Sequence, residues 1–235
     1  MTSLPARRAF AAGLGVAALT ATLIAGASPA AAKPKQNPGP PPVNLQLLAI
    51  NDFHGQLEPP SGSSSTLPDY PAIAETPTSP AVPAPAFGGA EYLATQVRQL
   101  EAETKKQNTL TVAAGDLIGA SPLLSAAFHD EPTIEAMNLL GLDYASVGNH
   151  EFDEGSEELL RMQNGGCLAE ESCPDGSFDG ADFQYLSANA FYENNSDETL
   201  LPPYAVHKVQ GIKVGFIGMT LEGTDKIVTP SGVAG

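Results

Sequence analysis

The sequence predicts an α/β domain whose sheet is at least partly parallel. Short apolar segments typical of strands alternate with segments whose apolar residues recur at helical spacing. In addition, three of the apolar segments end in clusters of Asp, Asn and His. Ligand sites of parallel sheets form beyond the carboxyl ends of the strands, so these clusters can converge on one place.

The elements of the first half follow in order. A buried strand is expected at 43–50 (VNLQLLAI). Residues 90–106 carry apolar side chains every three or four positions with charges between them, which predicts an amphipathic helix. The pattern then repeats as a strand at 110–114, a helix at 132–140 and a strand at 144–147.

The second half continues the alternation less regularly. A helix is expected at 157–162 and a further strand at 185–188. The segments 204–209 and 212–219 flank a Gln-Gly pair, which predicts a β-hairpin.

The first 32 residues have the pattern of an export signal. Arg7 and Arg8 form a positive start, an apolar run follows at 9–27, and three alanines at 30–32 supply a small-residue cleavage site. The Arg-Arg pair also partly fits a twin-arginine signal, so the general secretory (Sec) and twin-arginine (Tat) routes both remain open. No other segment approaches the roughly 20 apolar residues of a membrane span. We therefore expect an exported protein, secreted or in the cell envelope or periplasm, whose mature chain has no membrane span.

A Pro-rich spacer at 33–42 separates this leader from the predicted catalytic domain, which covers 43–235. Within that domain, residues 59–87 are rich in Pro and Ser and lack hydrophobic periodicity. They are expected to form a long surface insertion.

Both cysteines fall in an acidic, Gly-rich loop at 165–182. In an exported protein, Cys167 and Cys173 are expected to form a disulfide rather than remain free thiols. A zinc site is the alternative, but no His and no second Cys pair lies nearby in the sequence.

The charge balance is strongly acidic, with 11 Lys and Arg residues against 27 Asp and Glu residues and a formal net charge of −16. No stretch concentrates Lys and Arg, which disfavours coating of nucleic acid or binding to an anionic membrane. If such a protein handles anionic substrates, bound metal ions are the usual source of local positive charge.

The three polar clusters contain residue types suited to divalent metals. In the first cluster, Asp52 and His54 are two positions apart, so in an extended chain they point the same way and can hold one ion. Asp116 follows a glycine, which removes side-chain bulk, and its carboxylate can bridge two ions. Asn149 offers a neutral carbonyl oxygen. Each cluster has an ordinary alternative as a turn or helix cap, but their combination after apolar strands favours a site.

The third cluster adds two residues without an obvious ligand role. His150 directly follows Asn149 and is free to face a substrate. Asp153 can turn back to hold the imidazole in one tautomer and keep it protonated.

These blocks resemble the signatures of the calcineurin-like metallophosphoesterases. The matching segments are 51–55 (NDFHG), 114–116 (AGD) with Gly119 and Ser121, and 148–153 (GNHEFD). They are most similar to the secreted 5′-nucleotidase branch, which includes UDP-sugar hydrolases and 2′,3′-cyclic-nucleotide phosphodiesterases. The segments IEAMN and VGFIG, which begin at residues 134 and 214, also fit that branch.

The resemblance implies an α/β/β/α sandwich and a centre with two divalent metal ions. Asp52 and His54 would bind the first ion, Asp116 would bridge both, and Asn149 would bind the second. His150 and Asp153 would form the catalytic dyad. The implied substrates are nucleoside 5′-phosphates or related phosphoesters, and Mn, Zn, Mg, Ca and Fe all suit these ligand types.

The chain also departs from the family pattern, because family members supply further His ligands from later blocks. The remaining histidines, His129 and His207, are predicted to be structural or surface residues. We therefore expect the N-terminal part of a longer enzyme, with the sandwich incomplete at its C-terminal side and this stretch inactive alone. The alternatives are a non-catalytic extracellular binding or scaffold protein that keeps the fold, and a phosphodiesterase acting on cyclic nucleotides or sugar nucleotides.

Overall fold

The computed structural model describes residues 41–60, 87–168 and 177–234. Residues 42–235 cluster as one unit, separate from residues 1–41, and the description below concerns the described part of that unit. The predicted leader, nearly all of the Pro-rich spacer and most of the 59–87 insertion lie outside the described residues.

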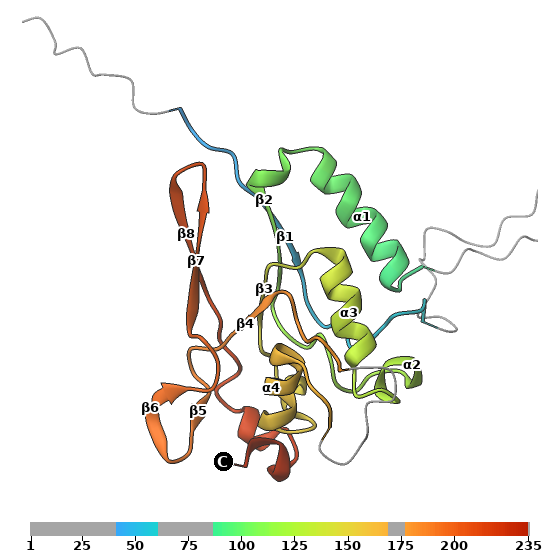
Figure 1. Cartoon of the computed structure of the whole chain (residues 1–235), viewed down its shortest axis with the longest axis vertical. Coiled ribbons are helices and arrows are strands. Elements are labelled where there is room, and N and C mark those ends of the chain that lie inside the picture. The colour runs from blue at the N-terminus through green and yellow to red at the C-terminus, as the bar shows by residue number, and fades with distance from the viewer. Residues whose placement is uncertain (1–40, 61–86, 169–176, 235) are drawn as a thin grey trace, which may run out of the picture. The chain divides into compact units, whose positions relative to one another are not determined.

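A four-stranded parallel sheet forms the centre of the unit (Figure 1). Its strands lie in the order β1-β2-β3-β4, and each pairs in parallel with its neighbour. Their bounds are β1 Gln46–Ile50, β2 Thr109–Ala113, β3 Tyr144–Ser146 and β4 Gln184–Leu186. The predicted α/β class with a parallel sheet is confirmed.

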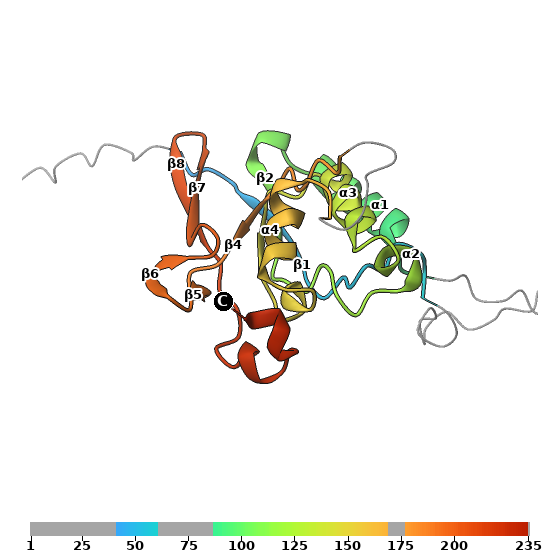
Figure 2. The same cartoon turned by 60° about the horizontal axis from the view of Figure 1, so that its bottom comes forward.

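Helices cover one face of this sheet, as both cartoon views show (Figures 1 and 2). They are α1 Ala90–Ala102, α3 Glu131–Leu140 and α4 Ser156–Asn164. The short helix α2 Leu123–Ala126 packs against α3. The apolar spacing explains the packing, because Ile134 and Met137 of α3 and Leu159 and Met162 of α4 are each at most 1% exposed. A Pro in the first turn of α3 and a left-handed Gly141 after its last residue fix the two ends of that helix.

Two antiparallel hairpins follow β4 in the chain. One pairs β5 Phe191–Tyr192 with β6 Asn195–Thr199, and the other pairs β7 Tyr204–Val209 with β8 Ile212–Ile217. The second hairpin was predicted, and Gln210 and Gly211 both have the positive φ that its two-residue turn requires.

The β7–β8 hairpin packs on the sheet face opposite the helices. The Phe216 ring of β8 stacks on Tyr144 of β3 with 4.8 Å between centroids, and the Tyr144 hydroxyl lies 3.2 Å from Nδ1 of His207. The hairpin therefore contributes a second β layer, in agreement with the implied sandwich.

Short 3₁₀ segments complete the fold, and their bounds are Lys106–Asn108, His150–Phe152, Thr224–Lys226 and Pro230–Val233. Among the described residues, no helix is long and apolar enough to cross a bilayer.

Several predicted boundaries were wrong. The first strand begins at Gln46 rather than at residue 43. The first helix ends at Ala102 rather than at residue 106, and residues 103–105 connect it to the 3₁₀ segment Lys106–Asn108. The β5–β6 hairpin was missed because β6 (NSDET) is polar and largely exposed, which leaves no hydrophobic alternation to detect.

The cysteine loop is described only in part. Cys167 takes part in a disulfide in the structure, and its expected partner, Cys173, lies outside the described residues.

Candidate metal centre

The three predicted polar clusters lie in the loops that follow β1, β2 and β3. Because these strands are parallel, the loops lie together at the carboxyl ends of the strands. Backbone hydrogen bonds continue the pairing beyond the first two strands. The amides of Asp52, His54 and Gly55 donate to the carbonyls of residues 115, 116 and 117 at 3.0–3.1 Å. The first two clusters are therefore held side by side by the same parallel pairing that builds the sheet.

Asp52 and His54 converge, but not for the predicted reason. Both residues have left-handed backbone conformations, with φ of 52° and 47°, so this segment is a turn rather than an extended strand end. Asp52 Oδ1 nevertheless lies 3.8 Å from His54 Nε2. The backbone turn, and not alternation along a strand, brings the two side chains together.

The His54 ring is oriented by a backbone carbonyl. Its Nδ1 lies 2.9 Å from the oxygen of Gly119. A carbonyl can only accept a hydrogen bond, so Nδ1 carries the proton and Nε2 keeps a free lone pair. That free nitrogen is the one near Asp52.

Asp116 joins the same cluster from the loop after β2. One donor atom each from Asp52, His54 and Asp116 lies within 4.8 Å of the others. The donor set of two carboxylates and one imidazole suits a divalent cation.

Two glycines allow the second and third loops to approach each other. A Cβ atom on Gly115 would lie 2.4 Å from the Gly148 nitrogen, and one on Gly148 would lie 2.1 Å from Oδ1 of Asp116. The same Oδ1 accepts a hydrogen bond of 2.9 Å from the His150 amide. Asp116 thus belongs to the group with Asp52 and His54 and also contacts the loop at 148–151 (GNHE).

Asn149, the predicted ligand of a second ion, directly precedes the 3₁₀ turn His150–Phe152 and is half-buried. It lies between Gly148 and His150, whose amides are both hydrogen-bonded to carboxylates of the site. Its backbone is therefore fixed from both sides.

The predicted dyad is formed within that turn. His150 Nδ1 lies 2.7 Å from Asp153 Oδ2, and each side chain is about a third exposed. The hydrogen bond to Asp153 raises the pKa of His150 above its ordinary value, against the opposing effect of burial, and the negative charges of Asp153, Asp116 and Glu151 add to the rise. The His150 ring meets the His54 ring edge-on, with 4.9 Å between centroids. The His150–Asp153 pair therefore lies next to the group formed by Asp52, His54 and Asp116.

Glu151 was quoted in the sequence motif but given no role. Its side chain is buried, with the residue 2% exposed, and its carboxylate accepts three backbone N–H bonds. The donors are Asp116 at 2.9 Å, Leu117 at 2.8 Å and Gly148 at 2.5 Å. Burial raises the pKa of Glu151 to about 7, although the three hydrogen bonds oppose the rise. The sequence signal that could have indicated this buried role is the position of an acidic residue between His150 and the apolar Phe152.

The two remaining histidines, His129 and His207, contact side chains other than the six predicted site residues. His207 bonds Tyr144 on the far face of the sheet, whereas His129 Nδ1 lies 2.7 Å from Glu154 Oε2. His129, Glu154 and Glu158 form a second group of close donor atoms. Arg161 donates to both carboxylate oxygens of Glu158 and so already supplies a positive charge there.

A mostly apolar cavity of about 740 Å³ also borders the motif. Phe152 lies in its wall, together with residues from β5 and from 219–225. None of the six predicted site residues lines it. The predicted metal ligands and the His150–Asp153 pair therefore lie outside this cavity.

A parallel α/β sheet with carboxylates, imidazoles and an amide after its strand ends is the architecture of a metallophosphoesterase. No family model matches the chain, but individual proteins are similar to it in sequence. An uncharacterized Acinetobacter calcoaceticus protein, from the pqq-V 5′ region, is 43% identical over 172 residues, covering 72% of this chain and 80% of that protein. Endonuclease YhcR of Bacillus subtilis is 36% identical, covering 81% of this chain and 14% of its own length.

Named nucleotidases also match. A 5′-nucleotidase of Vibrio cholerae is 32% identical over 144 residues, covering 60% of this chain and 23% of the relative. Among solved structures, the NAD nucleotidase NadN of Haemophilus influenzae has a TM-score of 0.53 at 25% identity, over 77% of this chain and 27% of its own. A 5′-nucleotidase precursor of Thermus thermophilus has a TM-score of 0.51 at 25% identity, over 80% of this chain and 31% of its own.

The chain belongs to the 5′-nucleotidase family of metallophosphoesterases, and its fold is that of the family's N-terminal domain. It spans most of the Acinetobacter relative but less than a third of the other relatives and structures named above.

Proposed function

We propose that this protein is an exported, metal-dependent hydrolase that cleaves nucleoside 5′-phosphates or related nucleotides to nucleoside and phosphate. The observation that carries the proposal is the convergence of Asp52, His54 and Asp116 beside the His150–Asp153 pair. Such a site combines a place for divalent cations with an acid–base group, which is what phosphate-ester hydrolysis requires.

In this proposal Asp52 and His54 would hold the first of two ions, Asn149 would help to hold the second, and Asp116 would be a ligand of both. The donor types support this assignment, since carboxylate, imidazole and amide oxygen all suit divalent metals of the Mn, Zn, Mg, Ca or Fe kind. When bound, such ions neutralise phosphoryl charge and lower the pKa of water. Since the described residues give the second ion only Asp116 and Asn149, we expect it to bind less tightly than the first and this stretch to be inactive alone. Activity is therefore assayed in a longer chain that supplies further ligands.

The chain's own acid–base group is His150. Because Nδ1 donates to Asp153, the protonated ring has its remaining proton at Nε2. From there it can donate to a phosphoryl oxygen or to the oxygen of the departing nucleoside. In the metal-free protein, the bond to Asp153 raises the pKa of His150 and so extends the pH range over which the ring is protonated.

A second candidate is cleavage of a phosphodiester. The relative YhcR is named an endonuclease, and it matches over more of this chain than the Vibrio 5′-nucleotidase does. The low content of Lys and Arg disfavours long nucleic acids as substrates, so cyclic nucleotides and sugar nucleotides are the diesters we would test first.

The test is a phosphate-release assay with Mn²⁺ or Zn²⁺ added to the metal-stripped protein. The substrates are a nucleoside 5′-monophosphate, a 2′,3′-cyclic nucleotide and a UDP-sugar. The products of the last two are phosphomonoesters, so an added phosphatase releases their phosphate for detection. The proposal expects metal-dependent release that is greatest for the monophosphate and that the H150A variant lacks. A protein that binds metal yet hydrolyses none of the three substrates would instead be a non-catalytic binding or scaffold protein.

A further inference from the structure

Asp130 is a nearly buried carboxylate outside the three motif clusters. It directly precedes α3, is 6% exposed and has a left-handed φ of 61°. Both of its oxygens are hydrogen-bonded. Oδ1 accepts from the Ser125 hydroxyl at 2.5 Å, and Oδ2 accepts from the Gly119 amide at 3.0 Å.

Gly119 connects this carboxylate to the group formed by Asp52, His54 and Asp116. While its N–H donates to Asp130, its carbonyl oxygen accepts the Nδ1 proton of His54. That second bond selects the tautomer in which Nε2 is free to bind a cation. Asp130 is therefore connected to His54 by two hydrogen bonds through a single intervening residue.

The position of Gly119 also matters for the dyad. A Cβ atom on Gly119 would lie 2.5 Å from the carbonyl oxygen of His150 and 2.7 Å from Oδ2 of Asp153. The backbone of Gly119 thus lies against His54 on one side and against the dyad on the other, and displacing it would disturb both.

A purely structural role for Asp130 makes a different prediction. Ser125 and Thr133 are fully buried, and their hydroxyl oxygens lie 2.6 Å apart, so Asp130 and these two residues form a buried polar network between α2 and α3. If the network only stabilised the fold, losing the Ser125 hydroxyl and losing the Asp130 carboxylate would have the same kind of effect.

We propose that Asp130 is a positioning residue of the metal centre, which holds Gly119 so that its carbonyl keeps the His54 ring oriented with Nε2 toward Asp52. This inference rests on the proposed metal-binding function. Groups that orient a ligand histidine typically change metal affinity by 10- to 100-fold when they are removed.

The test compares Mn²⁺ affinity, measured by titration calorimetry, among four forms of the full chain. Asp130→Ala removes the acceptor for Gly119, and we expect about tenfold weaker binding. Asp130→Asn removes the charge but keeps an oxygen that can face Gly119, and we expect affinity close to wild type. Ser125→Ala perturbs the same buried network without touching Gly119, so it should lower the melting temperature and leave affinity unchanged.

Wild-type affinity in Asp130→Ala would overturn the inference. So would an equal loss in Ser125→Ala, which would indicate a structural effect, or in Asp130→Asn, which would indicate a charge effect. If Asp130→Ala does not fold, Asp130→Glu replaces it, since the longer side chain keeps the charge but displaces the carboxylate. We then expect weaker binding, and wild-type affinity would contradict us.

A second measurement separates this inference from the proposed function. In the metal-free protein, ¹⁵N NMR of the histidine rings should show His54 with its proton on Nδ1, and Asp130→Ala should reduce that tautomer. An unchanged tautomer would overturn the positioning role. If the wild type bound no Mn²⁺ while the tautomer shifted as expected, the metal-binding function would fail and the positioning role would stand.

Discussion

Nδ1 of His150 lies 2.7 Å from Oδ2 of Asp153 within a single 3₁₀ turn. This short spacing is set by the backbone, because residues three apart in such a turn lie above one another. The contact holds one ring proton of His150 at Nδ1 and leaves Nε2 free for proton transfer. The ring lies next to three potential metal ligands.

Replacing His150 with Ala should lower kcat for nucleotide hydrolysis by about 10²- to 10⁴-fold, the usual contribution of a general acid–base group. Metal binding should remain, because the donors of Asp52, His54 and Asp116 are untouched. Steady-state kinetics and metal titration measure the two effects separately. His207→Ala, which alters a histidine on β7, is the matched control and should leave kcat unchanged.

The pKa of His150 in the metal-free protein should lie above the ordinary value of 6.5, since the bond to Asp153 stabilises the charged ring. A raised pKa means that the stabilisation is fully present below pH 6.5 and is lost as the pH rises through the folded-state pKa. Asp153→Asn should bring the pKa of His150 down, as followed by the NMR shifts of the ring. An unaltered titration curve in that variant would refute the pairing.

Glu151 should make the metal-free fold less stable as the pH rises. Its pKa in the folded protein is about 7, above the ordinary value of 4.5, so the folded protein binds a proton that the unfolded chain releases. Stability should therefore fall between about pH 4.5 and pH 7, by up to about 3 kcal/mol at 1.36 kcal/mol per pKa unit. Urea denaturation with a chelator measures this slope, and Glu151→Gln should flatten it. A slope of the same size in that variant would assign the effect to other groups.

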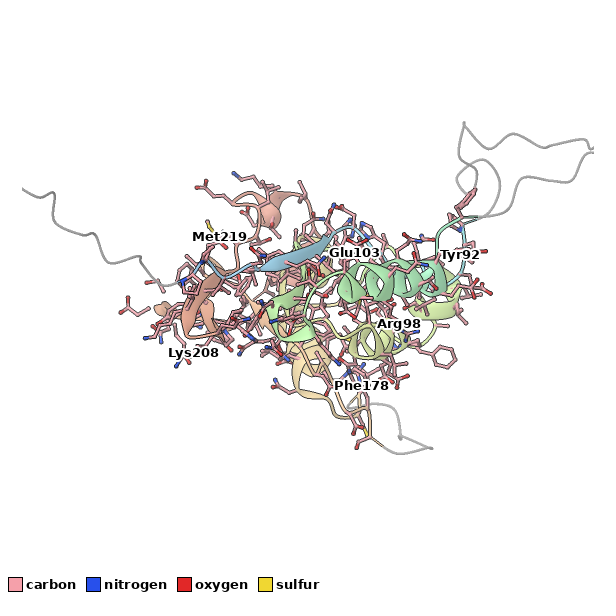
Figure 3. The ribbon with its side chains drawn as sticks, turned by 90° about the horizontal axis from the view of Figure 1, so that it is seen from above. Tyr92, Arg98, Glu103, Phe178, Lys208 and Met219 are labelled. Carbon is pink, nitrogen blue, oxygen red and sulfur yellow. The ribbon has the colours of Figure 1, made fainter. Side chains whose placement is uncertain are left out.

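Arg161 is expected to be a large contributor to stability. Its side chain is 8% exposed, pairs with Glu158 and Glu131, and places its guanidinium carbon 5.2 Å from the ring centre of Phe178, which Figure 3 labels. Arg161→Ala would leave the Glu158 side chain, which is 11% exposed, without its ion-pair partner, at a cost of up to about 3–5 kcal/mol. Arg98→Ala on the exposed side of α1, also labelled in Figure 3, should cost about 0.5 kcal/mol or less in the same denaturation experiment. A loss below about 1 kcal/mol for Arg161→Ala would show that the buried pair stabilises the fold little.

The alternation of apolar strands and amphipathic helices was sufficient to predict the parallel sheet and helices α1, α3 and α4, but not the short helix α2 (Leu123–Ala126). Burial on both faces favours a continuous apolar run, as in the largely buried β2. The apolar run of β1 was also detected, although alternate residues of this strand are exposed and the strand is less buried than predicted. The β5–β6 hairpin could not be predicted, since Asn195–Thr199 is polar and mostly exposed and so has no hydrophobic pattern.

The site residues could be named from the strand-end clusters, but their geometry could not. The convergence of Asp52 and His54 depends on two left-handed residues, which an extended-strand argument does not foresee. The roles of Glu151 and Asp130 depend on backbone N–H donors from distant loops, at Asp116, Leu117, Gly148 and Gly119. Such bonds leave no spacing signal in the sequence.

The central claim is that Asp52, His54 and Asp116 hold a divalent ion, and the most direct test is to count bound metal. The metal-free protein is dialysed against Mn²⁺ and then analysed for metal per chain, with Asp116→Asn as the matched variant. The account predicts at least one tightly bound ion per wild-type chain and the loss of at least one ion in the variant. A wild-type protein that retains no ion, or a variant that retains the wild-type number, would contradict it.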